Sequence, residues 1–428
     1  MVKLAYRALL LALVVASSQA LAQEKVREAT EEKAVPEDAA LGRMRDQLQR
    51  EFDALLVAPQ IYKARVEREC ARLPEAKLYP YALPALAYAN LAIRKPETSG
   101  HARGQMVKLL DMLLPLVAKE VRPPDGDLLK LRDYQQHAAQ IGMLNLVLGA
   151  FRLTGGDARY DALNDRLSAV LRDALQAADG RPIASYPGST WRFDTIVALA
   201  SLDLHDRVLG RNLAAPLATK HFAWIDEHGT DPATGLPRSG GAEKGLAGAP
   251  RGCELSFRLN LMTQFAPERA RALYAKYVQS HWVDLGQVAG FAEWPPGMPA
   301  KQDADSGPVV MGIGLVATGM GVGTVQAMGD RERQERLTRQ LSMIRPMVET
   351  LTAGGAAPQP DMASVAKWFQ TGGIPVRSGY VTGMLYGDAA LFYAATWVKY
   401  PDAPLPATPP AGDSPAPATP AVPAPGFR

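Results

Sequence analysis

Two aspartates stand at the start of a long stretch of this sequence that carries no charge. Residues 303–330 read DADSGPVVMGIGLVATGMGVGTVQAMGD, so that Asp303 and Asp305 are followed by a long run of uncharged residues. Carboxylates that share a partly desolvated cavity have their pKa values pushed apart, which makes one a proton donor and the other an acceptor. The chemistry that these residues suit is general acid–base catalysis. The alternative is helix capping by Asp305 or Ser306, with Pro308 in the first turn.

Similar polar loops precede other apolar stretches of the chain. They read RDYQQHAAQ, SYPGSTWRFDT, PRGCELS, FAEWPPGMPAKQDADSGP and PVRSGYVTG. We interpret Asp194 and one of Asp303 or Asp305 as the catalytic acid and base. Glu254 and Glu293 are alternates for these roles. Aromatic and basic residues of the same loops are candidates for substrate binding, because ligand cavities combine apolar walls with a few placed polar groups. These candidates are Tyr186, Trp191, Arg192, Arg251, Trp294, Tyr380 and His137.

Most of these candidates also have a purely structural alternative. Glu254 stands at a predicted helix start and could serve only the helix dipole. Arg192 and Arg251 could pair with nearby acids for stability alone, and His137 could be a cap or core residue. Asp194 lies one turn into its predicted helix, which is too late for a cap and favours a position that faces a cavity.

Six apolar helical stretches, most with an amphipathic partner, are expected to position these loops. They begin near Tyr81, His137, Trp191, Cys253, Pro308 and Gly379. Residues 307–328 would form one such helix, whose glycines are tolerated only where a neighbouring backbone or a cavity comes close. Repeated helical hairpins form either an open solenoid or a closed ring. Their number favours an all-α fold, an (α/α)6 toroid of six helical hairpins, in which the loops that enter the inner helices meet at one rim.

The charge and the ends of the chain limit the location and partners of the protein. Its 428 residues include 47 Lys and Arg and 44 Asp and Glu, and this net charge of +3 argues against nucleic acid as a partner. Residues 1–22 have the basic start, short apolar core and small-residue end of a signal peptide, which predicts export to the periplasm and no membrane span in the mature chain. Residues 23–39 are expected to be a flexible leader, 40–400 the barrel domain and 401–428 a disordered Pro/Ala-rich tail.

The cysteines and histidines do not follow a metal-binding pattern. Cys70 and Cys253 form either one disulfide, in an oxidising compartment, or two separate buried thiols. Because the two cysteines and six histidines lack the spacing of a zinc site, we expect neither a metal nor another cofactor.

Three stretches of the sequence resemble the linalool dehydratase/isomerase-like family of exported (α/α)6-barrel proteins. They are LNLVLGAFRLTGGDARYDAL, the stretch from IASYPGSTWRFDT to DEHGTDPATG, and DADSGPVVMGIGLVATGMGVGTVQAMGD, and the likeness extends from about Tyr79 to Leu351. The resemblance implies the fold, the export and a binding cavity, and it is compatible with a homo-oligomer. It does not extend to the two cysteines of the family's founding enzyme, whose positions are taken here by Ser185 and Asp194. The active-site histidine of that family falls near Met143.

Three classes of function fit these residues. The first, which the resemblance favours, is an acid–base lyase or isomerase that acts on a small molecule in a small, dry cavity. The second is a glycoside hydrolase or polysaccharide lyase, which needs a groove open to a carbohydrate. The third is a non-catalytic periplasmic protein that binds a ligand. The size of the cavity and the carboxylates that face it distinguish these alternatives.

Overall fold

The computed structural model describes residues 37–71, 74–240, 248–286, 288–299, 301, 305–307, 309–340 and 385–405. These residues are predominantly α-helical, which confirms the all-α class. Helix α2 (Glu37–Leu55) begins in the first of two compact units, Met1–Arg43, and all other described elements belong to the second, Met44–Arg428. The predicted signal peptide and nearly all of the predicted leader lie outside the described residues.

Apolar helices form the interior of the second unit. They are α4 (Tyr79–Arg94), α6 (Ala138–Leu153), α8 (Arg192–Leu209), α10 (Gly252–Phe265), α12 (Leu315–Met328) and α15 (Leu385–Ala395). The sequence explains their burial, since α6 for example reads AAQIGMLNLVLGAFRL and carries no charge before Arg152. A helix that is apolar on all sides is stable in water only when other elements surround it.

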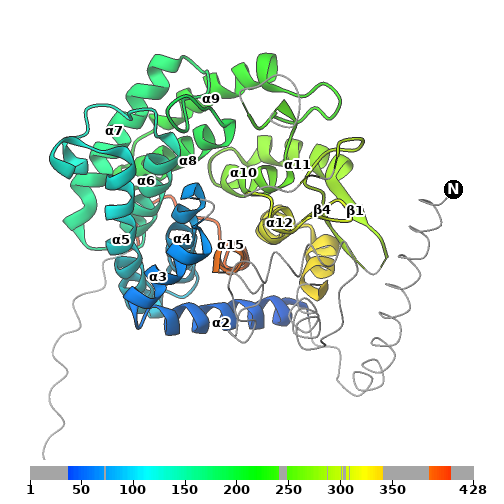
Figure 1. Ribbon diagram of the computed structural model, residues 1–428, viewed down its shortest axis with the longest axis horizontal. Coiled ribbons are helices and arrows are strands. Elements are labelled where there is room, and N and C mark those ends of the chain that lie inside the picture. Colours follow the sequence, from blue (N-terminus) through cyan, green and yellow to red (C-terminus); the bar gives the residue numbers. More distant parts are fainter. Residues whose placement is uncertain are drawn as a thin grey trace, which may run out of the picture. The chain divides into compact units, whose positions relative to one another are not determined.

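The packing of these helices follows their order in the chain. Helix α4 packs against α6, α6 against α8, α8 against α10, α10 against α12, and α12 against α15. Helix α15 in turn packs against α4, and Figure 1 shows α15 between α4 and α12. The first and last apolar helices of the described chain are therefore neighbours.

Amphipathic helices follow four of the apolar ones, as the sequence predicts. They are α5 (Ser99–Val121), α7 (Asp161–Ala178), α9 (Ala214–Trp224) and α11 (Pro267–His281). Helix α5 packs on α4 and α6, α7 on α6 and α8, α9 on α8, and α11 on α10. Residues 331–340 are also helical and follow α12, while α3 (Pro59–Glu69) packs against α5 and α15.

Short turns and strands connect the helices. The single-turn helices are η1 (Pro74–Leu78), η2 (Pro96–Thr98), η3 (Pro124–Gly126), η4 (Leu128–Lys130), η5 (Ala158–Tyr160) and the π-helical η6 (Ile225–Gly229). The strands are β1 (Trp282–Asp284), β2 (Ala289–Phe291), β3 (Val309–Val310) and β4 (Ile313–Gly314). Strand β1 pairs antiparallel with β2, with Trp282 opposite Phe291, and β3 pairs antiparallel with β4, with Val309 opposite Gly314.

Residues 307–328 do not form one continuous helix, so this part of the sequence prediction is wrong. The hairpin of β3 and β4 lies near the start of the stretch, and α12 begins directly after it at Leu315. The turn between the two strands places Met311 and Gly312 at φ angles of 54° and 85°, a left-handed conformation that suits a tight hairpin and that an α-helix does not contain. Asp305 consequently does not cap α12, whose N-cap residue is Gly314.

Two glycines of α12, Gly321 and Gly323, lie close to neighbouring groups as expected, whereas Gly319 of the same helix has no such neighbour within 4 Å. A Cβ atom on Gly323 would lie 3.0 Å from the backbone of Ala394 in α15 and 2.5 Å from the Asn260 side chain. A Cβ atom on Gly321 would lie 2.6 Å from the ring of Phe291. Real Cβ atoms essentially never lie closer than 3.0 Å to another atom, so an alanine at either position would have to displace its neighbours.

A buried polar network ties α6 to its neighbours α7 and α8. The side-chain amide of Asn145 donates hydrogen bonds to the hydroxyls of Ser168 and Ser201, each at 3.0 Å. Asn164 donates to the Asn145 side-chain oxygen at 2.8 Å. Buried polar groups of this kind are costly unless they are paired, so the network favours one relative position of the three helices.

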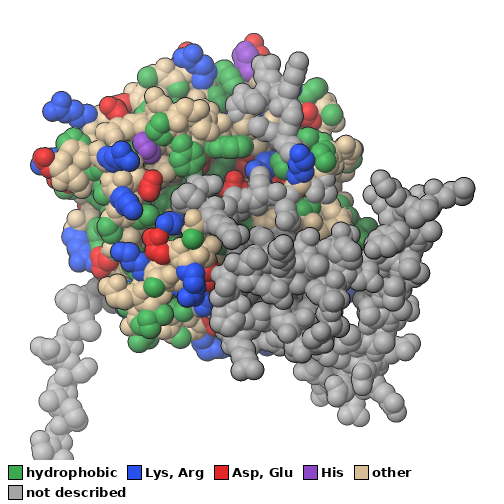
Figure 2. All heavy atoms as spheres, in the orientation of Figure 1, with side chains coloured by type: hydrophobic (Ala, Val, Ile, Leu, Met, Phe, Trp, Pro, Cys, Tyr) green, Lys and Arg blue, Asp and Glu red, His purple; other side chains and the backbone are tan. Residues whose placement is uncertain are grey.

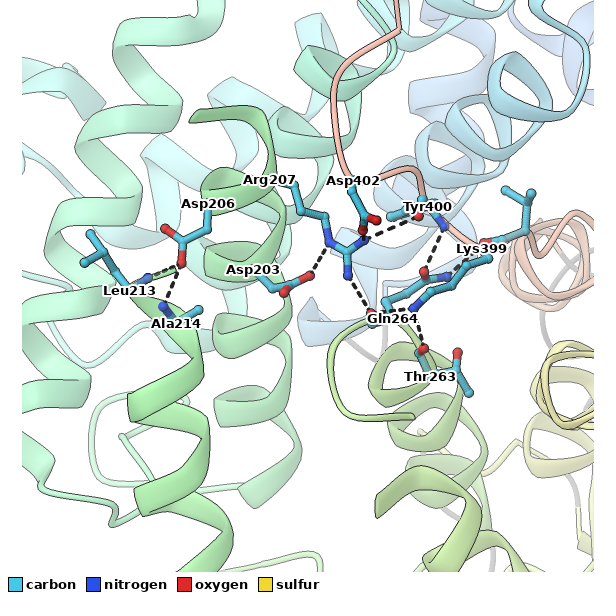
Figure 3. A network of polar contacts seen from close by, with 11 residues as sticks. Asp203, Asp206, Arg207, Leu213, Ala214, Thr263, Gln264, Lys399, Tyr400 and Asp402 are labelled. Carbon is cyan, nitrogen blue, oxygen red and sulfur yellow. Dashed lines mark hydrogen bonds and ion pairs between the residues drawn. The ribbon is translucent and has the colours of Figure 1, made fainter. Parts of the chain in front are cut away.

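The last described residues are anchored at the C-terminal end of α10 (Figure 3). Arg207 donates to Asp203 at 2.7 Å, to Asp402 at 3.0 Å and to the backbone oxygen of Gln264 at 2.6 Å. The ammonium of Lys399 donates to the same Gln264 oxygen at 2.6 Å. Both cations thus satisfy carbonyls that a helix end leaves without an intrahelical partner.

The predicted tail therefore begins with residues that contact the helices. Beyond Asp402, the backbone N–H of Leu405 donates to the backbone oxygen of Leu153, the last residue of α6, at 2.8 Å. The remainder of the predicted tail, residues 406–428, lies outside the described part of the chain.

Candidate functional site

A cavity of about 350 Å³ lies where several of the buried helices begin. It is lined by Tyr79, Tyr186, Trp191, Phe193, Asp194, Ser239, Arg251, Cys253, Glu254, Phe257, Asp305, Val316, Met320 and Tyr386. Many of these residues belong to the first two turns of α4, α8, α10, α12 and α15. Three of the predicted acid–base candidates, Asp194, Glu254 and Asp305, are among them. Helix N-termini carry partial positive charge, which favours carboxylates at this end.

Among the described residues that line the cavity, Asp194 is a carboxyl with a strongly altered ionisation. It is the third residue of α8, and only 6% of its surface is exposed. Burial raises the pKa of Asp194 from 3.8 to about 7, a hydrogen bond from Ser185 opposes this rise, and the nearby charges of Glu254 and Asp305 add to it. Near neutral pH this side chain is therefore present in both its protonated and its ionised form.

Glu254 holds a fixed position one turn into α10. Its carboxylate accepts a hydrogen bond of 3.0 Å from Nε of Arg258 and a second from Nη2 of the same guanidinium. Arg258 lies one turn further along the same helix, and its surface is 1% exposed. The sequence allowed a role for Glu254 in the helix dipole alone, but its carboxylate also forms a buried ion pair with Arg258.

Glu293 supports the lining of the cavity from behind. Its Oε1 lies 2.9 Å from Nε of Arg251, and the same carboxylate accepts hydrogen bonds from the backbone N–H and the thiol of Cys253, both at 3.1 Å. The residue is fully buried and is not among those that line the cavity. Burial raises the pKa of Glu293, and the charge of Arg251 opposes the rise. Its location suits a residue that positions Arg251 and Cys253 rather than one that touches a ligand.

Cys253 lines the cavity, although it was not among the binding or catalytic candidates. Burial raises the pKa of its thiol well above the usual value. Since the thiolate is the nucleophilic form of cysteine, this thiol is a poor nucleophile. Cys253 and Cys70 are both free and buried, which decides for separate thiols between the two alternatives left open by the sequence.

Asp305 lies at the more exposed part of the lining. Its side chain is half exposed, and Oδ2 lies 3.8 Å from Nη1 of Arg251. Arg251 thus lies between a buried carboxylate, Glu293, and a partly exposed one. Asp303 and Tyr380, the other candidates from the same and the last loop, lie outside the described residues.

The sequence matches no protein-family model, and no curated protein matches it.

Aromatic residues make up much of the lining. Tyr186 and Trp191 were predicted from sequence, whereas Tyr79, Phe193, Phe257 and Tyr386 were not. The rings of Tyr79 and Tyr386 have centroids 5.6 Å apart, and those of Phe193 and Phe257 4.9 Å apart. Burial raises the pKa of both Tyr79 and Tyr386 well above the usual value, so their hydroxyls are neutral. These four residues share a feature that the sequence does contain: each is an aromatic residue in the first two turns of an apolar helix.

Three predicted binding residues are not among those that line the cavity. Nδ1 of His137 lies 2.6 Å from the backbone oxygen of Gln135, just before α6. Arg192 is buried and donates to the backbone oxygen of Gly229 at 3.3 Å. The indole N–H of Trp294 donates to the backbone oxygen of Lys301 at 2.6 Å. Each of these contacts is made to a backbone oxygen. For Arg192 this differs from the alternative given by the sequence, which was a pair with a nearby acid.

Three other binding features are a metal-ligand cluster, a membrane-spanning helix and a surface patch of one charge. Among the described residues, no group of three His, Cys, Asp or Glu side chains is placed to hold a metal ion. In the same part of the chain, no helix combines the length and the apolar character needed to cross a membrane. On the face shown in Figure 2, Lys and Arg side chains are interspersed with Asp and Glu.

Proposed function

We propose that this protein is an acid–base lyase or isomerase that acts on a small molecule in the cavity. The observation that carries the proposal is Asp194, a buried carboxyl whose pKa is raised to about 7. It shares the cavity with the carboxyls of Glu254 and Asp305. A general acid or base is most effective when its pKa lies near the working pH.

The proposed reaction moves two protons. Protonated Asp194 gives its proton to a hydroxyl oxygen of the substrate, and the C–O bond breaks with release of water. A second carboxylate takes a proton from the neighbouring carbon, and the electrons of that C–H bond form the new double bond. Asp305 is the better acceptor of the two remaining carboxyls, because its side chain is half exposed at the cavity, whereas Glu254 is already held by Arg258. Addition of water in the reverse direction at another carbon gives isomerisation.

The size of the cavity supports a small substrate over a polymer. A volume of about 350 Å³ is near the lower limit for ligand sites, which range from roughly 300 to 1,000 Å³. A polysaccharide requires a longer groove than such a cavity offers. This argues for the first of the three functional classes over a glycoside hydrolase or polysaccharide lyase.

The same proposal includes the fold, the family and the location. We infer that the buried helices form the inner ring of an (α/α)6 toroid, and the contacts that run from α4 through α15 and back to α4 support this. The proposed relationship is to the linalool dehydratase/isomerase-like family. The proposed location, the periplasm, rests on the signal-peptide pattern of residues 1–22.

The test follows proton transfer itself. Purified protein is incubated in D₂O with a panel of small allylic and tertiary alcohols, and mass spectrometry detects loss of water and uptake of deuterium. Asp194→Asn should lower the rate by about 10²–10⁴-fold, which is the usual contribution of a general acid or base. Asp203→Asn is the matched control, since Asp203 lies on the same helix near its other end and pairs with Arg207. Turnover by Asp194→Asn at the wild-type rate would refute the proposal, and retention of a ligand without turnover would favour a binding protein.

A further inference from the structure

The hydroxyl of Ser239 is a buried polar group in the lining of the cavity. Ser239 is 1% exposed, and among the described residues its side-chain oxygen has no hydrogen-bond partner. A buried hydroxyl without a partner is costly, because it has lost its hydrogen bonds to water. A polar group on a bound molecule would supply that partner.

Backbone hydrogen bonds hold Ser239 beside the start of α8, the helix that carries Asp194. The backbone N–H of Arg192 donates to the backbone oxygen of Ser239 at 2.8 Å, and Trp191 pairs with Gly240 in an isolated antiparallel bridge. Asp194 follows Arg192 by two residues, in the first turn of α8. The Ser239 hydroxyl and the Asp194 carboxyl are therefore carried by backbones that are bonded to each other, and both line one cavity.

The charged groups of the cavity favour an uncharged substrate. A negatively charged group would meet the carboxyls of Asp194, Glu254 and Asp305, which line the same space. The guanidinium of Arg251, which is also in the lining, is bonded to Glu293 at 2.9 Å. A positively charged group would favour ionised Asp194, which has no proton to give to a leaving hydroxyl. A neutral molecule leaves Asp194 in the form that the proposed reaction needs.

Apolar side chains of the lining suit a hydrocarbon skeleton. Phe193, Phe257, Val316 and Met320 line the cavity and give a ligand no strong hydrogen bonds. In cavities of this kind, a small number of placed polar groups fixes the orientation of the ligand. The Asp194 carboxyl provides one such point, and the Ser239 hydroxyl provides a second.

We propose that the substrate is a neutral molecule with two hydroxyl groups, of which Asp194 protonates one and Ser239 binds the other. This assignment deepens the proposed function and rests on it, because it names the class of substrate for the same site. The first hydroxyl leaves as water with the proton from Asp194. The accepting carboxylate removes a proton from a neighbouring carbon that does not carry the second hydroxyl. The product is an unsaturated alcohol, which keeps its hydrogen bond to Ser239.

The test uses isothermal titration calorimetry on the full chain with three isomeric diols and one alcohol that lacks the second hydroxyl. The diols are 2-methylpentane-2,3-diol, 2-methylpentane-2,4-diol and 4-methylpentane-1,4-diol, and the mono-alcohol is 2-methylpentan-2-ol. All four share one carbon skeleton and one tertiary hydroxyl, and the diols differ in the separation of their two hydroxyls. At least one diol should bind about three- to tenfold more tightly than the mono-alcohol, which is the usual contribution of one hydrogen bond.

Ser239→Ala separates the effect of the second hydroxyl from that of the rest of the molecule. The variant should bind the preferred diol no better than the mono-alcohol. Its unchanged affinity for the mono-alcohol would show that the cavity is intact. The free variant should melt at the wild-type temperature or above it, because a buried hydroxyl without a partner has been removed. Ser280→Ala is the matched control, since Ser280 lies on α11 outside the lining, and it should bind all four probes as the wild type does.

Three results would overturn the inference. They are a mono-alcohol that binds the wild type as tightly as every diol, no binding of any diol at millimolar concentration, and an equal effect of Ser239→Ala on the preferred diol and the mono-alcohol. The deuterium-uptake test is independent of these results, because it follows Asp194→Asn. A diol preference that depends on Ser239, with unchanged turnover in Asp194→Asn, would refute the acid–base mechanism and leave the ligand class intact. Deuterium uptake that depends on Asp194, without a diol preference, would refute only the second hydroxyl.

Discussion

Nε of Arg251 lies 2.9 Å from Oε1 of Glu293, and both side chains are almost completely buried. Removal of one partner from such a pair leaves an uncompensated charge in the interior. We expect Arg251→Met or Glu293→Gln alone to lower the free energy of unfolding by about 3–5 kcal/mol. The double variant should cost clearly less than the sum of the two, because it leaves neither charge unpaired. Urea unfolding of the four proteins measures this, and additivity within about 0.5 kcal/mol would contradict a coupled pair.

The glycines of α12 provide a matched pair of substitutions. At Gly323 a methyl group would overlap the backbone of Ala394, so Gly323→Ala should destabilise the protein by about 1–3 kcal/mol. At Gly319 a Cβ atom would have no described atom within 4 Å, so Gly319→Ala should stabilise it by up to about 1 kcal/mol through helix propensity. Denaturant midpoints of the two variants should therefore shift in opposite directions. If both variants were destabilised to the same extent, the room available for a Cβ atom would not determine the effect of the substitution.

The sequence predicted the helices well where hydrophobic periodicity and length are unambiguous. The amphipathic helix α11 spans Pro267–His281, and the sequence marks it with a proline at its start and one apolar face. The predicted start of α12 was wrong because the apolar residues Val309, Val310 and Ile313 fit a buried strand as well as a buried helix. The left-handed turn at Met311 and Gly312 distinguishes the strand from the helix. A methionine is not typical of such a turn, so the sequence does not indicate it.

The site was predictable to the extent that its residues lie in polar loops before helices. This rule found Asp194, Glu254 and Asp305, whose side chains line one cavity. It did not separate them from Glu293, because a carboxylate beside the cavity and one directly behind it have the same sequence context. The hydrogen-bond partners of Glu293, which are Arg251 and Cys253, are 42 and 40 residues distant in sequence.

The C-terminal end of the described chain should contribute modestly to stability. Removal of residues 401–428 eliminates the hydrogen bond from Leu405 to Leu153 and the contact of Asp402 with Arg207. We expect a loss of about 1 kcal/mol, most of it from the unpaired carbonyl at the end of α6. Removal of residues 406–428 alone should change stability by less than about 0.5 kcal/mol, since a Pro/Ala-rich sequence has little to bury. Equal thermal melts for both truncations would show that the Leu405 contact adds nothing.

Two buried histidines should make the protein sensitive to acid. Burial lowers the pKa of His221 and of His281 from 6.5 to about 4. A depressed histidine pKa means that the unfolded chain binds more protons below pH 6.5, so stability is complete above that pH and is lost as the pH falls towards 4. His221→Gln should reduce this loss by roughly 2–3 kcal/mol in urea titrations at pH 4.5 against pH 7.5. The exposed His228→Gln is the control, and an acid dependence identical in both variants would exclude His221 as a cause.

Asp194 should lower the stability of the protein as the pH rises, whereas the two histidines lower it as the pH falls. Its pKa of about 7 in the folded protein lies above the value of 3.8 for an exposed aspartate. The folded state therefore binds more protons than the unfolded chain between these values, and the associated stability, complete below pH 3.8, is lost as the pH rises through 7. Asp194→Asn removes this titration and keeps a polar group of the same shape. We expect the variant to be more stable than the wild type by roughly 2–4 kcal/mol at pH 8, with the difference shrinking steadily towards pH 4. Urea unfolding of both proteins across this range gives the difference directly. A difference independent of pH would mean that Asp194 ionises as an exposed carboxyl does, and the acid–base proposal would lose its main support.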